Sequence, residues 1–263
     1  MHGRQLSAFT LIELLVVITI LGLLMAIMLT SLARVHAAGK SFVCKNQLKN
    51  VAFDFIQFAD DWAHPPRGDS EKYGRSVFDI EDFQERQYGI SEFWKVSGGG
   101  GYSLGDAVKY KASEQPLICP AGPQNLQKRP KLACSEGAVT PLDNVSTGFN
   151  MRLRYASVGP NSQGAFVMAQ VRLSKRTMSQ PTVPLVFDVD GAAAAANPLP
   201  HLLPYYSAPP AGLPGQYAIN NFWYPSLRHA GRCNAAFIGG HVSSSSTPER
   251  ESGWNWKYQP PVD

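Results

Sequence analysis

A long apolar segment preceded by a single carboxylate constrains this chain more than any other feature. Between Leu14 and Leu32 the only polar side chains are those of Thr19, Thr30 and Ser31. These 19 residues, at about 1.5 Å each in a helix, cover roughly the 30 Å hydrocarbon core of a bilayer. The segment therefore predicts a membrane-spanning helix.

Glu13 is the carboxylate at the start of this segment. An ionised side chain costs on the order of 2.5 to 3.5 kcal/mol at the centre of a membrane span and less near its end, so Glu13 is a functional residue by default. A buried carboxylate and a buried ammonium satisfy each other across a subunit contact, whereas either alone is an uncompensated charge. We therefore expect Glu13 to have a cationic partner.

The residues that lead into the helix resemble the processing site of type IV pilins and type II secretion pseudopilins. The matching residues are Phe9, Thr10, Leu11, Ile12 and Glu13. The resemblance implies that a prepilin peptidase cuts between Ala8 and Phe9, and that the new amine of Phe9 is methylated. It also implies that Glu13 pairs with the Phe9 amine of a neighbouring subunit. Ala8 stands where the family usually has Gly, and Ala is small enough for the same protease pocket.

An ordinary secretory signal peptide is the main alternative for this N-terminus. Arg4 would be its basic region, and Val35, His36 and Ala37 would form its cleavage site. However, the apolar stretch is longer than the roughly 7 to 15 residues usual in such peptides, and a glutamate at its start is unexpected. This alternative predicts a secreted periplasmic binding domain. A plain anchor predicts a membrane-attached domain or sensor that never assembles.

Composition leaves room for one sizeable globular domain behind the helix. The chain has 263 residues, and its 23 Gly and 20 Pro favour short strands and many turns. The formal net charge of +4 is dispersed over the chain, so we expect no nucleic-acid partner. Flanking charges do not set the topology. The pilin resemblance implies a single-pass protein of the bacterial inner membrane, with a cytoplasmic leader and a periplasmic C-terminal domain.

The helix is expected to continue past the membrane, from about residue 10 to about residue 61. Apolar residues recur with a period of about 3.6 until Pro65 and Pro66 end the pattern. These residues are Val43, Cys44, Leu48, Val51, Ala52, Phe55, Ile56, Ala59 and Trp62. We expect this face to pack against the globular domain.

The fold predicted for the chain is α+β and pilin-like, with the long helix packed on an antiparallel sheet that carries long loops. We expect strands at 117–119, 147–155, 164–171 and 183–189, a short helix at 91–96 and a surface loop at 190–225. The core should include Phe78, Phe83, Phe93 and Trp94. The expected organisation is a leader (1–8), a transmembrane assembly helix (9–33), the extramembrane half of the helix (34–62) and the globular domain (63–263).

Four cysteines allow one or two disulfides in an oxidising compartment, and spacing alone does not rank their pairings. They are Cys44, Cys119, Cys134 and Cys233. Residues 44–50 and 117–120 resemble segments of a subgroup of bacterial pilin-like proteins, and our first choice of pairing is Cys44 with Cys119. Cys119 with Cys134 is the runner-up. Because the chain has no Cys-x-x-Cys pair and no His at zinc-finger spacing, we expect no metal cluster.

Residues 228–242 predict a hairpin, with a strand to Ile238, a turn at Gly239 and Gly240 that needs positive φ, and a return strand from His241. The segment resembles the His-x9-Asp-Gly ending of the same subgroup, with His229 in the matching position. Gly239 replaces the family Asp. This keeps the turn but removes a carboxylate that would cap it or pair with His229.

Catalysis and cofactor binding have little support in the sequence. His229, His241, Asp188 and Asp190 could converge, but no nucleophile motif accompanies them, so we expect no enzymatic activity. Calcium bound by the two aspartates and backbone carbonyls is the only cofactor considered, and the spacing matches no complete ligand set.

The function implied by the resemblance is structural. Protomers would wait in the lipid bilayer, lose the leader to prepilin peptidase, and be assembled by an inner-membrane platform and its ATPase. The product would be a type II secretion pseudopilus or a type IV pilus-like filament. Its partners would be copies of this chain and other pseudopilins.

Overall fold

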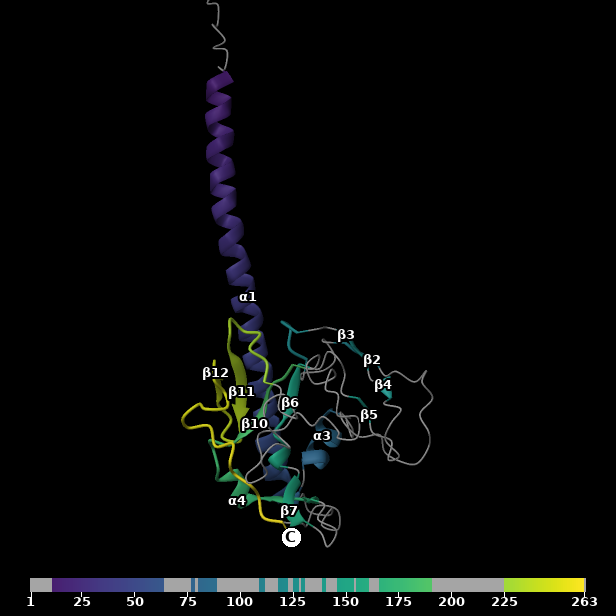
Figure 1. The fold of residues 1–263 in the computed structure, drawn as a ribbon. Coiled ribbons are helices and arrows are strands. Elements are labelled where there is room, and N and C mark those ends of the chain that lie inside the picture. Colours follow the sequence, from purple (N-terminus) through teal and green to yellow (C-terminus); the bar gives the residue numbers. More distant parts are fainter. Residues whose placement is uncertain are drawn as a thin grey trace, which may run out of the picture.

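One long helix, α1 (Leu11–Ala63), forms the axis of the molecule in this computed structural model. Figure 1 shows its N-terminal half projecting alone from a body that surrounds its C-terminal half. This confirms the predicted single helix. The structure describes residues 11–63, 77–78, 80–88, 109–111, 118–122, 125–127, 129–130, 139–140, 146–153, 155–160, 166–190 and 225–262.

The exposure of α1 changes near residue 40. Every residue from 11 to 39 is exposed, whereas one face of the helix is buried from residue 44 onward. The buried residues on this face are Cys44, Leu48, Val51, Ala52, Phe55, Phe58 and Ala59. Their spacing of three and four keeps them on one side of the helix. The predicted face is confirmed in outline, although Val43 is exposed and Phe58, which we did not predict, is buried.

The main sheet is antiparallel and has the strand order β12-β11-β10-β6. Its strands are β6 (Thr147–Phe149), β10 (Pro184–Asp188), β11 (Cys233–Phe237) and β12 (Val242–Ser245). Helix α1 contacts β10, β11 and β12, which lie beside its lower half in Figure 1. The sheet and the helix therefore make the α+β arrangement expected of a pilin-like fold.

The strands β10 and β11 are buried along their whole length because both faces of the sheet are covered. Successive side chains on a strand point to opposite faces. On β10, the Asp188 side chain contacts Cys44 of α1, whereas the Phe187 ring packs edge-to-face on Trp256 at 5.2 Å. The sheet thus lies between α1 and the C-terminal segment.

Shorter elements complete the described part of the chain. The helical elements are α3 (Ile80–Tyr88), the 3-10 helix η2 (Met151–Leu153) and α4 (Lys175–Met178). Four antiparallel strand pairs are described outside the main sheet: β1 (Val77–Phe78) with β9 (Leu173–Ser174), β2 (Lys109–Lys111) with β3 (Asn125–Gln127), β4 (Arg129–Pro130) with β5 (Val139–Thr140), and β7 (Tyr155–Pro160) with β8 (Phe166–Gln170).

Aromatic rings fill the core between α1 and its neighbours. The Phe55 ring packs edge-to-face on Phe83 at 5.1 Å and on Phe78 at 5.8 Å. The predicted core positions of Phe78 and Phe83 are therefore confirmed. Phe93, Trp94 and the predicted helix at 91–96 lie outside the described residues.

The strand predictions had mixed outcomes. The runs at 164–171 and 183–189 correspond to β8 and β10. The prediction for 147–155 was confirmed for β6 and for Tyr155, the first residue of β7, but was wrong at 150–153. There the Asn150 side chain accepts the Arg152 N–H at 3.1 Å and the chain turns into η2. The strand predicted at 117–119 was also wrong at residues 118 and 119, which the structure describes as irregular. The Gly122 N–H bonds the Cys119 carbonyl at 2.9 Å in a turn there.

Candidate functional site

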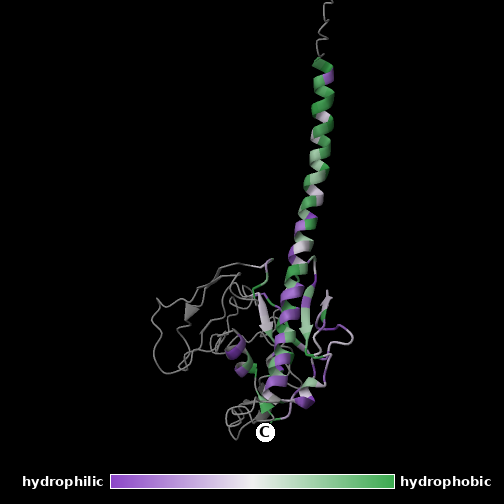
Figure 2. Ribbon diagram, turned by 180° about the vertical axis from the view of Figure 1, so that it is seen from behind, coloured by the Kyte–Doolittle hydropathy of each residue, from purple (hydrophilic) through white to green (hydrophobic). Residues whose placement is uncertain are grey.

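The projecting half of α1 exposes a continuous apolar surface. Leu11 is 82% exposed and Met28 is 70% exposed. Figure 2 shows this half as almost uniformly hydrophobic, in contrast to the mixed half within the body. In the described part of the chain, α1 is the one helix that is long and apolar enough to cross a membrane. A surface of this kind marks a membrane or protein contact.

The polar side chains within this segment bond to the helix itself. The hydroxyl of Thr19 donates to the Val16 carbonyl at 2.8 Å. Thr30 and Ser31 donate in the same way to carbonyls three residues earlier, each at 2.9 Å. Their hydroxyl protons are thereby satisfied without water, as a helix in hydrocarbon requires.

Glu13 lies in the first turn of α1, where the positive end of the helix dipole favours a carboxylate. Ala8 and Phe9 lie outside the described residues. Cleavage between them, methylation of Phe9 and the pairing of its amine with Glu13 therefore stay predictions.

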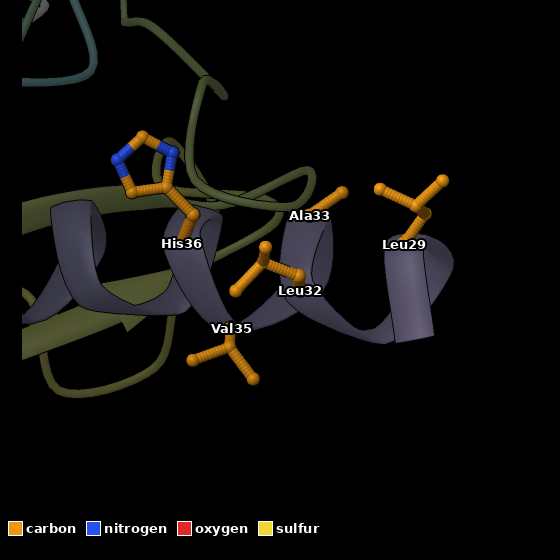
Figure 3. A pocket seen from close by; sticks show the side chains of 5 residues that line it. All are labelled: Leu29, Leu32, Ala33, Val35 and His36. Atoms are coloured by element: carbon orange, nitrogen blue, oxygen red, sulfur yellow. The ribbon is translucent and has the colours of Figure 1, made fainter. Parts of the chain in front are cut away.

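A shallow depression follows on the same helix. It is lined by Leu29, Leu32, Ala33, Val35 and His36. Figure 3 shows these side chains projecting from successive turns, with Val35 on the side opposite His36. Leu29, Ala33 and His36 project to the same side of the helix in Figure 3. Four of the five residues are apolar and all five are exposed, so the depression is a part of the exposed apolar surface and not a separate ligand site.

A second feature lies inside the body, where four side chains of metal-binding type meet. They are Cys44 of α1, Cys119, Asp188 at the end of β10, and His229. All four are buried, and one ligand atom of each lies within 4.8 Å of the others. The Cys44 Sγ is 3.3 Å from Asp188 Oδ1, and the Cys119 Sγ is 3.3 Å from His229 Nε2. The same His229 nitrogen is 3.4 Å from Asp188 Oδ2.

Backbone groups fix two members of this cluster. The Asn234 N–H donates to Asp188 Oδ2 at 2.8 Å, and this bond joins the carboxylate to the neighbouring strand β11. The Ala121 N–H points at the Cys119 sulfur at 3.4 Å, while the Cys119 N–H donates to Ser146 Oγ at 2.7 Å.

A tight turn positions His229, the third fixed member. The Gly231 N–H bonds the Leu227 carbonyl at 3.1 Å, and the His229 N–H bonds the Arg232 carbonyl at 3.3 Å. Ala230 and Gly231 both have positive φ, 52° and 76°. The turn therefore sets the imidazole opposite the end of β10.

The cluster is strongly coupled electrostatically. The hydrogen bond with Cys44 lowers the pKa of Cys119 to about 5, and it raises the pKa of the Cys44 thiol, which burial raises further. Burial lowers the pKa of His229, but hydrogen bonds to Asp188 and Cys119 outweigh it and bring the pKa to about 9. The groups thus stabilise anionic sulfur next to a proton-binding imidazole.

The structure brings the predicted cysteine pair, Cys44 and Cys119, together in the cluster. Their disulfide stays a prediction. Cys134 lies outside the described residues. Cys233 is buried on β11, and burial raises the pKa of its thiol.

Of the four residues considered for catalysis, only His229 and Asp188 belong to this cluster. The His241 ring stacks on Phe237 at 4.3 Å, and Asp190 is exposed. Sequence reasoning missed the cluster as a whole because its members come from four separate segments. Their spacing in the sequence does not indicate a shared site, although each of the four residues was considered for another reason.

The C-terminal hairpin is confirmed as β11 and β12, but its turn differs from the prediction. The Gly240 N–H bonds the Phe237 carbonyl at 2.8 Å, so Ile238 and Gly239 are the central residues. Only Gly240 has positive φ, 82°. A Cβ on Gly239 would lie 2.7 Å from the Cβ of Pro181. Gly239 is therefore required by close packing, and the carboxylate beside His229 comes from Asp188.

Comparison with known proteins identifies the N-terminus. Residues 4–29 match the family model described as the prokaryotic N-terminal methylation motif. No curated protein and no solved structure matches the chain. The motif implies processing by prepilin peptidase and assembly with pilin-like subunits. Together with the long apolar helix that it overlaps, the motif supports a membrane-anchored prepilin of the type IV pilin-like kind.

Proposed function

We propose that this chain is a structural subunit of a filament of the type II secretion pseudopilus or type IV pilus kind. The observation that carries the proposal is the methylation motif at residues 4–29, which includes much of a helix half whose residues 11–39 are all exposed. A helix of this kind is soluble in lipid as a monomer, and bundling with other helices buries the same surface in a filament.

The two halves of α1 have different roles in assembly. The apolar half supplies cohesion through packing against neighbouring copies. Glu13 accepts the methylated Phe9 amine of an adjacent subunit and thereby sets the axial register, since each charge compensates the other away from water. The second half of α1 anchors the globular domain, which the filament displays on its outside. This role needs no catalytic site.

The rival function, a secreted binding domain released by signal peptidase, is compatible with the core. The first buried residue of α1 is Cys44, so cleavage near Ala37 would leave the packed part of the helix intact. The two functions therefore differ in the fate of residues 9–37 and not in the fold. What favours the filament is the motif, which an ordinary signal peptide does not need.

Processing in the presence and absence of the peptidase tests the proposal. The chain is expressed in a host that carries a pilus or pseudopilus machinery, and in the same host with an inactive prepilin peptidase. We expect a shortened chain that is recovered in sheared filaments from the first host, and an uncleaved membrane-bound chain in the second. Release of a soluble chain of equal size from both hosts would support the secreted binder instead.

A further inference from the structure

The buried cluster of Cys44, Cys119, Asp188 and His229 has a donor set that suits a metal ion. We propose that these four side chains bind one structural zinc ion, which fastens α1 to the sheet at the point where the helix leaves the globular body. The inference concerns the folded domain and does not depend on which filament the chain joins.

The spacing of the donors fits tetrahedral coordination. Zinc bonds sulfur at about 2.3 Å and nitrogen or oxygen at about 2.0 to 2.2 Å, which places neighbouring ligands in a tetrahedron about 3.4 to 3.8 Å apart. The contacts in the cluster are 3.3 Å from Cys44 to Asp188, 3.3 Å from Cys119 to His229 and 3.4 Å from His229 to Asp188. The first of these contacts uses Oδ1 of Asp188 and the last uses Oδ2, and all four ligand atoms lie within 4.8 Å of one another. An ion at the centre would therefore draw the side chains together by about 1 Å or less.

The chemistry of the donors selects the metal. Two thiolates, one imidazole and one carboxylate form a set that zinc prefers, whereas calcium and magnesium take oxygen ligands. All four positions would be filled by protein, and all four residues are buried. A closed, buried site of this kind is structural and leaves no position for a reacting water.

The surroundings of the cluster resemble an outer ligand shell. The Asn234 N–H orients the Asp188 carboxylate at 2.8 Å, and the Ala121 N–H approaches the Cys119 sulfur at 3.4 Å. Hydrogen bonds of this type hold metal ligands in place and stabilise thiolates. Zinc would displace the protons of the thiols and of the imidazole, and its charge would then compensate the carboxylate and the two thiolates, which are costly to bury without a cation.

The same two sulfurs could instead form a disulfide, and the two states exclude each other. A Cys44–Cys119 disulfide would use two of the four side chains and would leave Asp188 and His229 to each other. Zinc accounts for the convergence of all four, including the His229 Nε2 that faces both Cys119 and Asp188. Because a disulfide would explain the position of only two of the four side chains, we prefer zinc to the disulfide.

The first test uses the full-length chain, extracted from the envelope of its native host in detergent without chelator. We expect about one zinc per chain by elemental mass spectrometry, because four protein ligands define one site. Cysteines are also alkylated in denaturant with chelator but without reductant. Alkylation of both Cys44 and Cys119 is expected. A disulfide-linked peptide that joins them, or a chain without zinc, overturns the proposal.

Variants locate the ion. Cys44→Ser and Asp188→Asn should each weaken zinc retention at least about tenfold, as the loss of a ligand or its support does. Cys233→Ala and Asp190→Asn are the matched controls, because neither residue is one of the four ligands and Asp190 is exposed. The Cys233 Sγ faces the backbone carbonyl of Asp188 at 3.5 Å and not its carboxylate, so this variant also controls for packing next to the site. Both controls should keep the wild-type zinc content. Equal retention in all four variants contradicts the site.

X-ray absorption of the wild-type protein keeps the test independent of variant folding. The expected zinc shell has two sulfurs at about 2.3 Å and two nitrogen or oxygen atoms at about 2.0 to 2.2 Å. A shell with no sulfur would show that any zinc is bound elsewhere and would overturn the assignment.

Discussion

The Sγ of Cys44 and the Oδ1 of Asp188 are 3.3 Å apart, although 144 residues separate them in the sequence. This contact joins the first buried position of α1 to the end of the central strand β10. From Cys44 onward one face of the helix belongs to the protein core, whereas residues 11–39 are all exposed. The contact therefore marks the boundary between the folded domain and the segment expected to assemble.

Removing the charge of Glu13 should impair assembly without preventing insertion. Glu13→Gln and Glu13→Ala keep the apolar helix but leave the Phe9 amine of a neighbour without its counter-charge, which we expect to lower filament yield at least about tenfold. Membrane-fraction and sheared-filament levels are compared in a host that carries the machinery. Asp61→Asn, at the exposed far end of α1, is the control. Wild-type filament yield from both Glu13 variants would refute the role of this carboxylate.

Truncation of Phe55 should strongly destabilise the domain. Its side chain is fully buried and packs against Phe78 and Phe83, so Phe55→Ala should cost about 3 to 5 kcal/mol of unfolding free energy. Phe42→Ala is the control, because Phe42 on the same helix is 72% exposed. The control should change stability by no more than about 0.5 kcal/mol. Denaturant unfolding in detergent measures both, and similar values would argue against the packing of α1 on the body.

Two glycines should respond oppositely to alanine. Gly239→Ala places a Cβ 2.7 Å from the Cβ and 2.9 Å from the carbonyl oxygen of Pro181, and the resulting overpacking should cost about 1 to 3 kcal/mol. A Cβ at Gly39 meets no atom within 4 Å, so Gly39→Ala should stabilise helix α1 by up to about 1 kcal/mol. Thermal unfolding of the two variants gives the signs. A neutral Gly239→Ala would show that the hairpin turn does not rest on Pro181.

Chelation should destabilise the protein if zinc occupies the cluster. Loss of an ion present at about a thousand times its dissociation constant removes about 4 kcal/mol, which corresponds to a fall in melting temperature on the order of 10 °C. Zinc, and not magnesium, should restore the original value. Cys44→Ser should unfold at the lower temperature with or without chelator. A wild-type protein that is insensitive to chelator and free of zinc would contradict the site.

The parts of the fold that the sequence predicted are those encoded by local patterns. The apolar run, the period of the residues between Cys44 and Ala59, and the two glycines after Ile238 specify the helix and the hairpin without distant information. Phe58 was not predicted, although it stands three residues after Phe55 and so fits the same period. The end of β6 was missed because it depends on the side-chain hydrogen bond of Asn150.

The buried cluster could not be predicted because it depends on tertiary structure. Cys44, Cys119, Asp188 and His229 become neighbours only when α1 packs on β10 and the turn before β11 sets the imidazole. The family resemblance suggested a link between the two cysteines, but it gave no reason to add the aspartate and the histidine. Gly239 shows the same limit, since its contact with Pro181 exists only in the folded sheet.

The mature N-terminus tests the central claim most directly. The chain is extracted from the membranes of its native host, and its intact mass and N-terminal sequence are determined. We expect a chain that begins with a methylated Phe9, which would establish processing as a prepilin. A terminus near Ala38 would contradict the filament function, because the entire exposed half of α1 would then be absent from the mature protein.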